Sequence, residues 1–581
     1  MARRSLCDAS ADRRSHSGAR GLCAGHGIMN KRRDQFKSLK DRLAAIAAAV
    51  GGQTPPPPTP STGTRRSLQP WEKIRGSHAD LARQLDELAR SADFGDVDRA
   101  RIAHVIDRSM TNQEELERLT RAIERDNSAA LVHPSQQRNL PGRRFARHNL
   151  LAGQVRLGEV VADHRSDFEI TGDFGIDLDV LRTSLLVIGP PGSGKTRGMA
   201  TPIVEHLSLA ALTGKASMVV IDPKSTDFAY DGWFDVTIDP LNPSCGFSLF
   251  GGSRTADVAA DRLASALLPP RVSDDKAYFI DASKNALYAC LAPFEAAYQR
   301  WPTVPELLGL LRADQASMDR VKERLKGPGA KELKALLDTR KAQTQRSADP
   351  AASLVERFAL LDRPSLRNLF DHPGPMFQMR DLNRPVRVRV ALPEAEYPDA
   401  SRILARLVVS QFVQITSSSE TDRSIFKGLV IDEAGRFVDD YVARGVQKLR
   451  SNNAGLVLLS QTMSDFPPEV RATVFGSTGC KAVFGGIDPA DADVFSRWFG
   501  DQYVTETTIS RSATTGVQYN EFGSMGGRSE SRTSGYSARR VERARWTVSD
   551  IITGVPAGHA LVSLARSNGV RVGPVLVNLR A

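Results

Sequence analysis

The sequence has few cysteines, and none of them is spaced for a structural role. Five occur in 581 residues, and no two form a C-x-x-C pair. An odd number of cysteines without paired spacing argues against a disulfide framework or a zinc site. We therefore expect all five thiols, at positions 7, 23, 245, 290 and 480, to be small buried or inert side chains in a reducing compartment.

Long apolar runs are also missing. No stretch of about 18 apolar residues occurs, which is the length that a membrane-spanning helix requires. The arginine-rich start lacks the continuous apolar segment of a secretory signal. The sequence therefore predicts a cytoplasmic protein without a transmembrane helix, and its 41% hydrophobic and 25% charged residues are ordinary for a globular chain.

Positive charge is concentrated at the beginning of the chain. Residues 1–70 hold 13 Lys/Arg against 4 Asp/Glu, out of a net charge of +11, so we expect a disordered basic tail rather than a basic body. Apolar residues at 36, 39, 43, 46 and 50 form one stripe of an amphipathic helix, and four prolines at 55–58 predict a stiff linker. The stripe could dock on an acidic membrane surface or a partner, although a frayed helix without function is the favoured interpretation.

Short continuous apolar runs separated by helical stretches favour a sheet of buried parallel strands. Such runs occupy residues 184–188, 217–221, 428–431, 455–459 and 481–484. Each is followed by a polar residue or a glycine-rich turn, and open α/β sheets bind ligands at that edge. The fold class predicted from these runs is α/β with a mostly parallel sheet.

Outside these apolar runs, the spacing of apolar residues divides the chain into further segments. Helical spacing predicts a helical segment at residues 71–135 and an inserted all-α subdomain at 252–380. Residues 136–251 and 381–581 then form one nucleotide-binding domain. Within it, the Ser, Thr, Gly and Arg of residues 505–540 cannot build a core, which predicts a flexible loop.

The strongest motif is a complete G-x-x-x-x-G-K-[ST] phosphate loop. It comprises Gly189, Pro190, Pro191, Gly192, Ser193, Gly194, Lys195 and Thr196. The glycines let successive backbone N–H groups face phosphate oxygens, and the following helix adds its positive end. Lys195 would neutralise the β- and γ-phosphates, and Thr196 would bind Mg²⁺. The motif predicts an ATPase with ATP and Mg²⁺ as its cofactors.

Two carboxylates follow a second run. Residues 428–431 lead directly into Asp432 and Glu433. We expect Asp432 to hold the magnesium ion and Glu433 to polarise the attacking water. An acidic pair after a strand is common by itself, so this assignment depends on the phosphate loop lying in the same sheet.

Further polar residues follow or precede the other runs. Gln461 is predicted to sense the γ-phosphate or orient water, and Arg450 to reach a neighbouring subunit's nucleotide as an arginine finger. Alternatively, these are a surface amide and a solvated arginine. Asp222 and Lys224 would lie at the same sheet edge as Lys195, or form a plain turn. Because no N-K-x-D motif occurs, ATP is preferred to GTP.

Taken in order, the motifs resemble the coupling-protein ATPases of type IV secretion and conjugation, the TraG/TraD group within the FtsK/HerA class. The resemblance covers about residues 140–580. Its pieces are the phosphate loop, V-V-I-D-P-K at 219–224, D-P-L-N-P at 239–243, V-I-D-E at 430–433, L-R-S-N-N-A-G-L-V-L-L-S-Q at 449–461 and T-G-C-K-A-V-F-G at 478–485.

The resemblance implies a RecA-like P-loop core that works as a homo-hexamer with nucleotide between subunits. It implies transport of single-stranded DNA, with or without an attached relaxase, towards the membrane components of a type IV secretion apparatus. Most members carry amino-terminal transmembrane helices, so attachment at the inner face of the membrane would need a separate partner. Two alternatives remain: a soluble FtsK/HerA-like DNA motor without a secretion role, and a nucleotide-gated adaptor with little turnover.

Overall fold

A computed structural model describes residues 69–580, apart from residues 92, 111, 167–171, 269–273, 439, 520 and 524. The expected tail, with its helix at 36–50 and its proline linker, lies outside these residues. No helix in the described part of the chain combines the length and the apolar character needed to cross a membrane.

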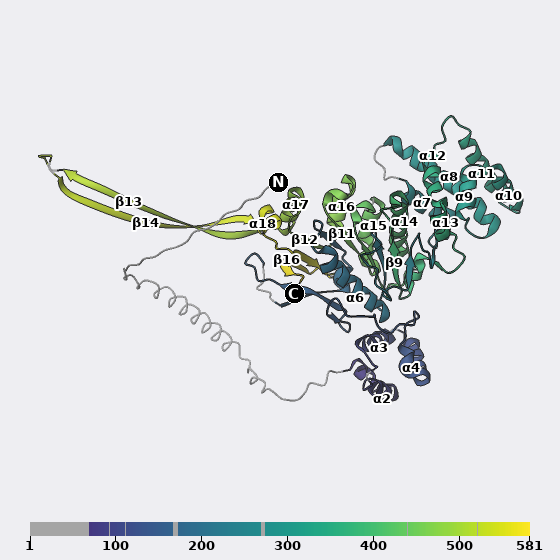
Figure 1. Cartoon of the computed structure of the whole chain (residues 1–581), viewed down its shortest axis with the longest axis horizontal. Coiled ribbons are helices and arrows are strands. Elements are labelled where there is room, and N and C mark those ends of the chain that lie inside the picture. The colour runs from purple at the N-terminus through teal and green to yellow at the C-terminus, as the bar shows by residue number, and fades with distance from the viewer. Residues whose placement is uncertain are drawn as a thin grey trace, which may run out of the picture. The chain divides into compact units, whose positions relative to one another are not determined.

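One large sheet organises the nucleotide-binding part of the chain (Figure 1). Seven of its strands are parallel, in the spatial order β12-β4-β11-β10-β5-β9-β6. Their bounds are Cys480–Phe484, Leu185–Ile188, Ala454–Ser460, Phe426–Ile431, Ala216–Asp222, Arg387–Ala391 and Val236–Ile238. The five apolar runs are thus strands, and the predicted mostly parallel α/β sheet is confirmed.

Antiparallel strands extend the sheet beyond β12. β15 (His559–Ala565) pairs with β12, β16 (Arg571–Asn578) follows, and the next strand is β2 (Gln154–Val160). β2 pairs with both β1 (His148–Asn149) and β3 (Gly172–Asp177). The chain segments before the phosphate loop and at the end of the described residues therefore lie beside each other.

Helices cover both faces of the parallel strands, because alternate residues of each strand belong to different cores. Leu186 and Ile188 of β4 pack in one core with α14 (Pro398–Ser417), α15 (Asp440–Leu449) and α16 (Pro468–Ser477). Leu185 and Val187 pack in the other with α6 (Thr201–Leu212), which is buried along its whole length. A strand buried on both faces must be apolar throughout, which explains the continuous runs.

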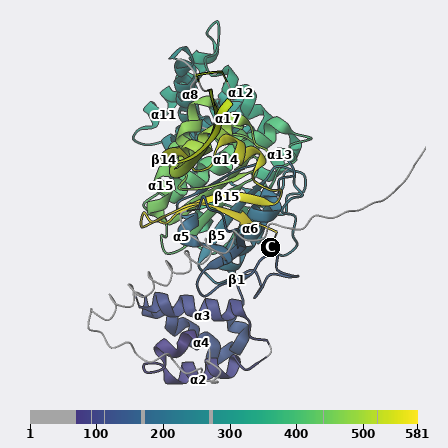
Figure 2. The same ribbon diagram turned by 90° about the vertical axis from the view of Figure 1, so that its left-hand side faces the viewer.

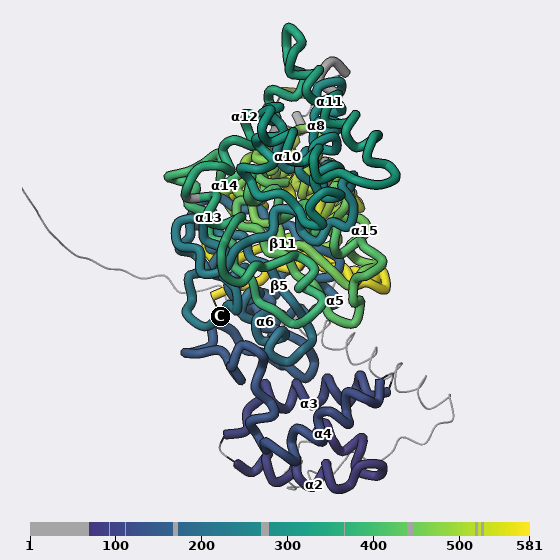
Figure 3. Tube along the Cα trace, turned by 90° about the vertical axis from the view of Figure 1, so that its right-hand side faces the viewer, coloured from purple at the N-terminus to yellow at the C-terminus, as the bar shows by residue number. Residues whose placement is uncertain are grey.

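The inserted segment is almost entirely helical (Figure 3). Its helices are α7 (Ala256–Leu267), α8 (Asp274–Tyr298), α9 (Val304–Leu311), α10 (Gln315–Arg324), α11 (Ala330–Thr344), α12 (Ala352–Ala359) and α13 (Pro364–Phe370). At its two ends, β7 (Gly246–Phe247) and β8 (Met376–Phe377) pair side by side. The segment therefore leaves the core and returns to it at one place.

The first described helices lie together (Figure 2), and they share a small hydrophobic core of their own. The helices α2 (Ala79–Leu88), α3 (Asp96–Ser109) and α4 (Gln113–Asp126) pack around the fully buried Trp71. The guanidinium of Arg101 on α3 donates to the backbone carbonyl of Leu212 at the end of α6. This helical segment is thus joined by a partly buried polar contact to the helix that follows the phosphate loop.

Residues 505–540 differ from the flexible loop that their composition suggested. They form most of two long antiparallel strands, β13 (Asp501–Tyr519) and β14 (Met525–Ala544), paired along their length (Figure 1). The composition argument was right that no core is built, since nearly every described side chain here is exposed. It failed because hydrogen bonds between two strands require no apolar core.

Candidate nucleotide site

The phosphate loop connects the carboxyl end of β4 to a helix. Gly192 and Gly194 have φ angles of 76° and 99°, which side chains disfavour, so glycine is needed at both positions. A Cβ at Gly189 would lie 2.7 Å from Ser193 Oγ and 3.0 Å from Phe484. After the loop, one π-helical turn (η3, Thr196–Ala200) leads into α6. The strand–loop–helix order expected for a phosphate cradle is present.

The acidic pair lies at the same edge of the sheet as the loop. β10 is separated from β4 only by β11, and all three strands are parallel, so their carboxyl ends meet. Thr196 Oγ1 donates to Asp432 Oδ2 at 3.5 Å, and Lys195 Nζ lies 4.0 Å from Glu433 Oε1. The structure therefore brings together the residues that were predicted to bind phosphate, hold the metal and activate water.

Gln461 follows β11, the strand that lies between β4 with its phosphate loop and β10 with its acidic pair. Its Nε2 donates to both carboxylate oxygens of Glu433, at 3.0 and 3.2 Å. Glu433 itself has a left-handed backbone with φ of 51°, which is unusual for a residue other than glycine. Backbone strain of this kind persists where surrounding contacts hold a residue in place. Here the Glu433 side chain is held by Lys195 and Gln461.

The acidic pair at this edge of the sheet is buried, and nearby positive charge does not fully balance it. Asp432 is 1% exposed, and its burial together with the nearby Glu433 raises the pKa of its carboxyl to about 6. The hydroxyl oxygen of Ser193 is buried and has no hydrogen-bond partner among the described residues. Oxygen ligands around a carboxylate whose negative charge is not fully balanced suit Mg²⁺. This ion needs only one or two protein ligands beside phosphate and water. Thr196 and Asp432 therefore fit the magnesium ion.

Asp222 and Lys224 lie at the predicted edge of the sheet, because β5 pairs with β10, and the charge of Lys224 acts on Asp432; their direct bonds, however, are to other residues. Asp222 is fully buried and bound to Arg389 at 2.8 Å, while its carboxylate also accepts the backbone N–H of Phe228. Lys224 is exposed and pairs with Asp227 at 2.9 Å, which raises its pKa. The first residue ties β5 to β9, and the second closes a surface turn.

Arg450 lies at the opposite edge of the sheet. It belongs to a short turn (η7, Arg450–Asn452) that precedes β11, whereas Gln461 follows that strand. The strand between them spans roughly 23 Å. Arg450 is exposed and lines a separate cavity of about 330 Å³ with Arg182, Arg566 and Arg571. It therefore does not meet the phosphate loop of its own chain.

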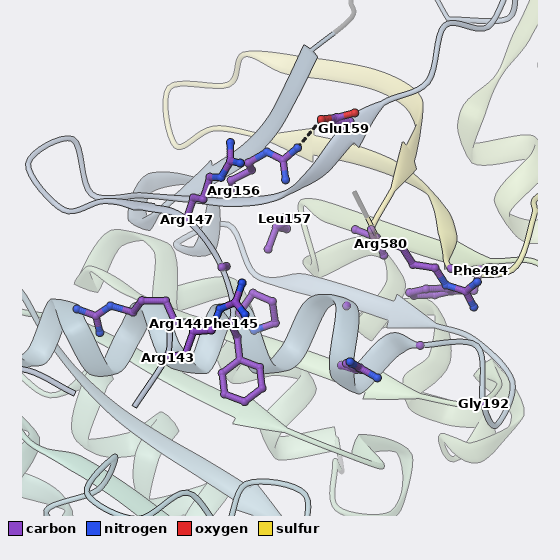
Figure 4. Close-up of a pocket in the computed structure, with 17 residues that line it drawn as sticks. Arg143, Arg144, Phe145, Arg147, Arg156, Leu157, Glu159, Gly192, Phe484 and Arg580 are labelled. Carbon is purple, nitrogen blue, oxygen red and sulfur yellow. Dashed lines mark hydrogen bonds and ion pairs between the residues drawn. The ribbon is translucent and has the colours of Figure 1, made fainter. Parts of the chain in front are cut away.

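Sequence reasoning missed a second part of the site, a cavity of about 1060 Å³ beside the phosphate loop (Figure 4). It touches Gly192, Gly194 and Arg197, but not Lys195, Asp432 or Glu433. The other lining residues come from segments far apart in the sequence, including Arg143, Arg144, Phe145, Arg147, Leu157, Phe484, Leu579 and Arg580. The arginine-rich run at residues 143–147 was the only signal available.

A buried polar network fixes that arginine-rich run to α6. Glu205 is 1% exposed and accepts the backbone N–H groups of Phe145 and Ala146 at 3.0 Å. The ring of His148 donates to the same carboxylate at 2.8 Å and stacks on His206, whose burial lowers its pKa to about 3. The wall of the cavity is therefore held by the helix that follows the phosphate loop.

Comparisons with known proteins agree with this fold. The family model TraG-D_C, described as the TraM recognition site of TraD and TraG, matches residues 428–551. The solved structure of the bacterial conjugative coupling protein TrwBdeltaN70, in an unbound monoclinic form, is 18% identical with a TM-score of 0.50. It covers 70% of this chain and 86% of its own. No curated protein matches the chain.

Two further solved structures are similar at lower scores. TrwB in complex with ADP and Mg²⁺ is 18% identical with a TM-score of 0.49, over 70% of this chain and 86% of that one. VirB4 of Thermoanaerobacter pseudethanolicus is 14% identical with a TM-score of 0.40, over 76% and 97%. The family-model match and the TrwBdeltaN70 structure confirm the resemblance indicated by the motifs: the chain has the RecA-like fold seen in TrwBdeltaN70, and its residues 428–551 match the model of the TraG and TraD family.

Proposed function

We propose that this protein is an ATP-hydrolysing coupling protein that recruits DNA, or a DNA–relaxase complex, and moves it towards a type IV secretion or conjugation apparatus. The observation that carries the proposal is the meeting of Lys195 and Thr196 with Asp432, Glu433 and Gln461 at one edge of the sheet. A nucleotide-binding module without turnover would not need Glu433 in that position.

The two parts of the site orient the nucleotide. The acidic pair marks the γ-phosphate end, because Lys195 and Thr196 face it. The first turn after a phosphate loop lies at the α-phosphate, and here that turn opens into the arginine-lined cavity. The nucleoside would therefore enter this cavity, between guanidinium groups and the apolar surfaces of Phe145 and Leu157.

Each residue then has a distinct role in hydrolysis. Lys195 neutralises phosphate charge, and Thr196 with Asp432 would hold the magnesium ion, which screens the triphosphate. Glu433 accepts a proton from the attacking water, and Gln461 keeps that carboxylate in place through two hydrogen bonds. Arg450 would act on the nucleotide of a neighbouring subunit in a homo-hexamer, since it cannot reach its own.

ATPase rate with and without single-stranded DNA, measured together with native mass, tests the proposal. Stimulation by DNA in a hexamer supports a DNA motor, whereas slow turnover unaffected by DNA supports the adaptor. Capture of a relaxase by the full chain, and its loss when residues 252–380 are removed, would favour a secretion role over general DNA processing.

A further inference from the structure

The hairpin of β13 and β14 is long and stands outside both cores of the sheet. Its register pairs Asp501 with Ala544 at the base and Val517 with Arg528 near the tip. Within the part of the chain that the structure describes, neither strand pairs with a third strand, and nearly every side chain of the hairpin is exposed. A two-stranded ribbon of this kind gains little stability by itself, which suits a segment that works against a partner.

The two faces of the hairpin differ in composition. Partners in the register share a face, and successive pairs alternate between faces. From the pair Thr505–Arg540 to the pair Val517–Arg528, one face carries four arginines against one acidic residue, Glu530, together with exposed apolar and aromatic side chains. We call it the aromatic–arginine face; its members include Tyr503 with its partner Glu542 at the base, then Arg540, Ile509, Tyr536, Arg511, Arg532, Val517 and Arg528.

The opposite face is neutral and small. Over the same span it carries Arg539 opposite Glu506, and otherwise serine, threonine and glycine, at positions 508, 510, 512, 514, 516, 529, 531, 533, 535 and 537. Arg543, nearer the base, is also on this face and bonds to Glu506. The segregation of rings and positive charge to one face therefore does not follow from the overall composition of the segment.

The apolar groups on the aromatic–arginine face are open to solvent. Tyr503, Ile509 and Tyr536 are 60%, 61% and 71% exposed. Arg540 lies over the ring of Tyr503 at 4.6 Å, so cation and ring already share one surface. The four arginines spread over roughly 40 Å of ribbon, at about 3.4 Å per residue. Two rings and four guanidinium groups thus lie along one extended strip, with both rings in the half nearer the base.

We propose that the aromatic–arginine face binds single-stranded DNA, with tyrosine rings stacking on bases and arginines contacting phosphates. Exposed rings interleaved with positive charge are the arrangement that binds unpaired strands without sequence preference. Duplex DNA fits less well, because its bases are already stacked. A protein partner is the alternative that the experiments below separate from DNA. The proposal rests on the proposed function, in which DNA is the cargo.

Matched pairs of substitutions on the two faces test the proposal in the full chain. Arg511→Ser with Arg532→Ser removes two charges from the aromatic–arginine face, and Arg539→Ser with Arg543→Ser removes two from the opposite face. Binding of fluorescent oligo-dT is measured between 50 and 300 mM salt. The first pair should lower the slope of log affinity against log salt by about 1.4, and the control pair should leave it unchanged.

A ring substitution separates stacking from charge. Tyr536→Ser should weaken oligo-dT binding about tenfold, whereas Tyr536→Phe should retain wild-type affinity. A hairpin shortened by replacing residues 506–539 with Asn-Gly, between the paired Thr505 and Arg540, should lose this binding. The same variant should keep its ATPase rate in the absence of DNA, because the hairpin touches none of the nucleotide-site residues.

The outcomes distinguish this proposal from the proposed function. If the two double arginine substitutions weakened DNA binding equally, DNA would be attracted by bulk charge, and the proposed binding face would be wrong. If the shortened chain bound DNA as tightly as the wild type, the proposed binding face would also be wrong. DNA-stimulated hydrolysis in that chain would still support the proposed DNA motor. Loss of relaxase capture with unchanged DNA binding would assign the hairpin to a protein partner instead. Absence of DNA binding by the wild-type chain would overturn both.

Discussion

Thr196 and Asp432 stand 236 positions apart in the chain, yet the threonine hydroxyl donates to the aspartate carboxylate at 3.5 Å. The contact joins the end of the phosphate loop to the end of β10 across the intervening strand β11. Since both side chains offer hard oxygen atoms, their approach defines where a divalent cation would be held. Most of the predictions below depend on this edge of the sheet.

Magnesium affinity should depend on pH through Asp432. Burial raises its pKa to about 6, so the carboxyl carries a proton below that pH and the cation must displace it. Apparent Mg²⁺ affinity should fall by up to about tenfold per pH unit below pH 6 and level off above pH 7. Mg²⁺ titration of nucleotide binding between pH 5 and 8 measures this, and Asp432→Asn should bind weakly at every pH. A flat profile in the wild type would contradict the assignment.

Lys195→Ala should weaken ATP binding by about 100-fold or more, because the phosphates lose a buried charged partner. Calorimetric titration with ATP and Mg²⁺ measures the loss. Lys73→Ala is the matched control, since that lysine is exposed and pairs with Asp107 in the amino-terminal helical segment. Comparable losses in the two variants would show that general positive charge, rather than the loop geometry, holds the nucleotide.

Glu433→Gln should bind ATP normally and hydrolyse it at least about 100-fold more slowly, because the water loses its proton acceptor. Single-turnover hydrolysis measures the chemical step separately from binding. Gln461→Ala should give a smaller decrease, since it only frees the Glu433 side chain. Normal turnover in the Glu433 variant would remove that residue from the mechanism.

Arg450→Ala should lower hydrolysis only in assembled rings, by as much as about 1,000-fold, because the residue lies at the far edge of its own sheet. Subunit mixing makes the test sharp: an Arg450→Ala chain combined with a Glu433→Gln chain should regain activity at interfaces where both wild-type residues meet. No recovery in mixed rings would place Arg450 outside the neighbouring site.

Glu205→Ala should destabilise the folded chain by about 3 kcal/mol, because two backbone N–H groups and His148 lose a buried acceptor. It should also weaken ATP binding, since the wall of the arginine-lined cavity is no longer fixed. Chemical unfolding and ATP titration measure the two effects. Glu205→Gln keeps one acceptor oxygen and should show about half of each effect; an unaltered midpoint in both variants would mean that the network is dispensable.

The parallel strands and the phosphate loop could be read from the sequence because each depends on local pattern. Strands buried on both faces must be continuously apolar, and the loop requires fixed residue types at fixed spacing. The position of the acidic pair followed from the same logic, since the carboxyl ends of neighbouring parallel strands meet at one edge.

Other features depend on partners distant in sequence and left no local pattern. The alternating Arg387 and Arg389 of β9 suggest an exposed strand, yet both are buried because Asp235 and Asp222 pair with them. Glu205 interrupts an apolar helix, and nothing near it in the sequence indicates its three hydrogen-bond partners at residues 145, 146 and 148. The hairpin was missed because its period of two lies among polar residues, where a search for apolar alternation finds nothing.

The pairing of β7 with β8 has a practical consequence for dissecting the protein. Because these strands flank the inserted helices and are hydrogen-bonded to each other, the severed ends left by excising that segment would lie about 5 Å apart. A few glycines could span the gap, but α7 packs on α14 in the same core as the sheet, and Arg262 of α7 donates to Gln414 of α14. Exchange of these helices for those of a relative, rather than their removal, would therefore ask whether cargo choice depends on them.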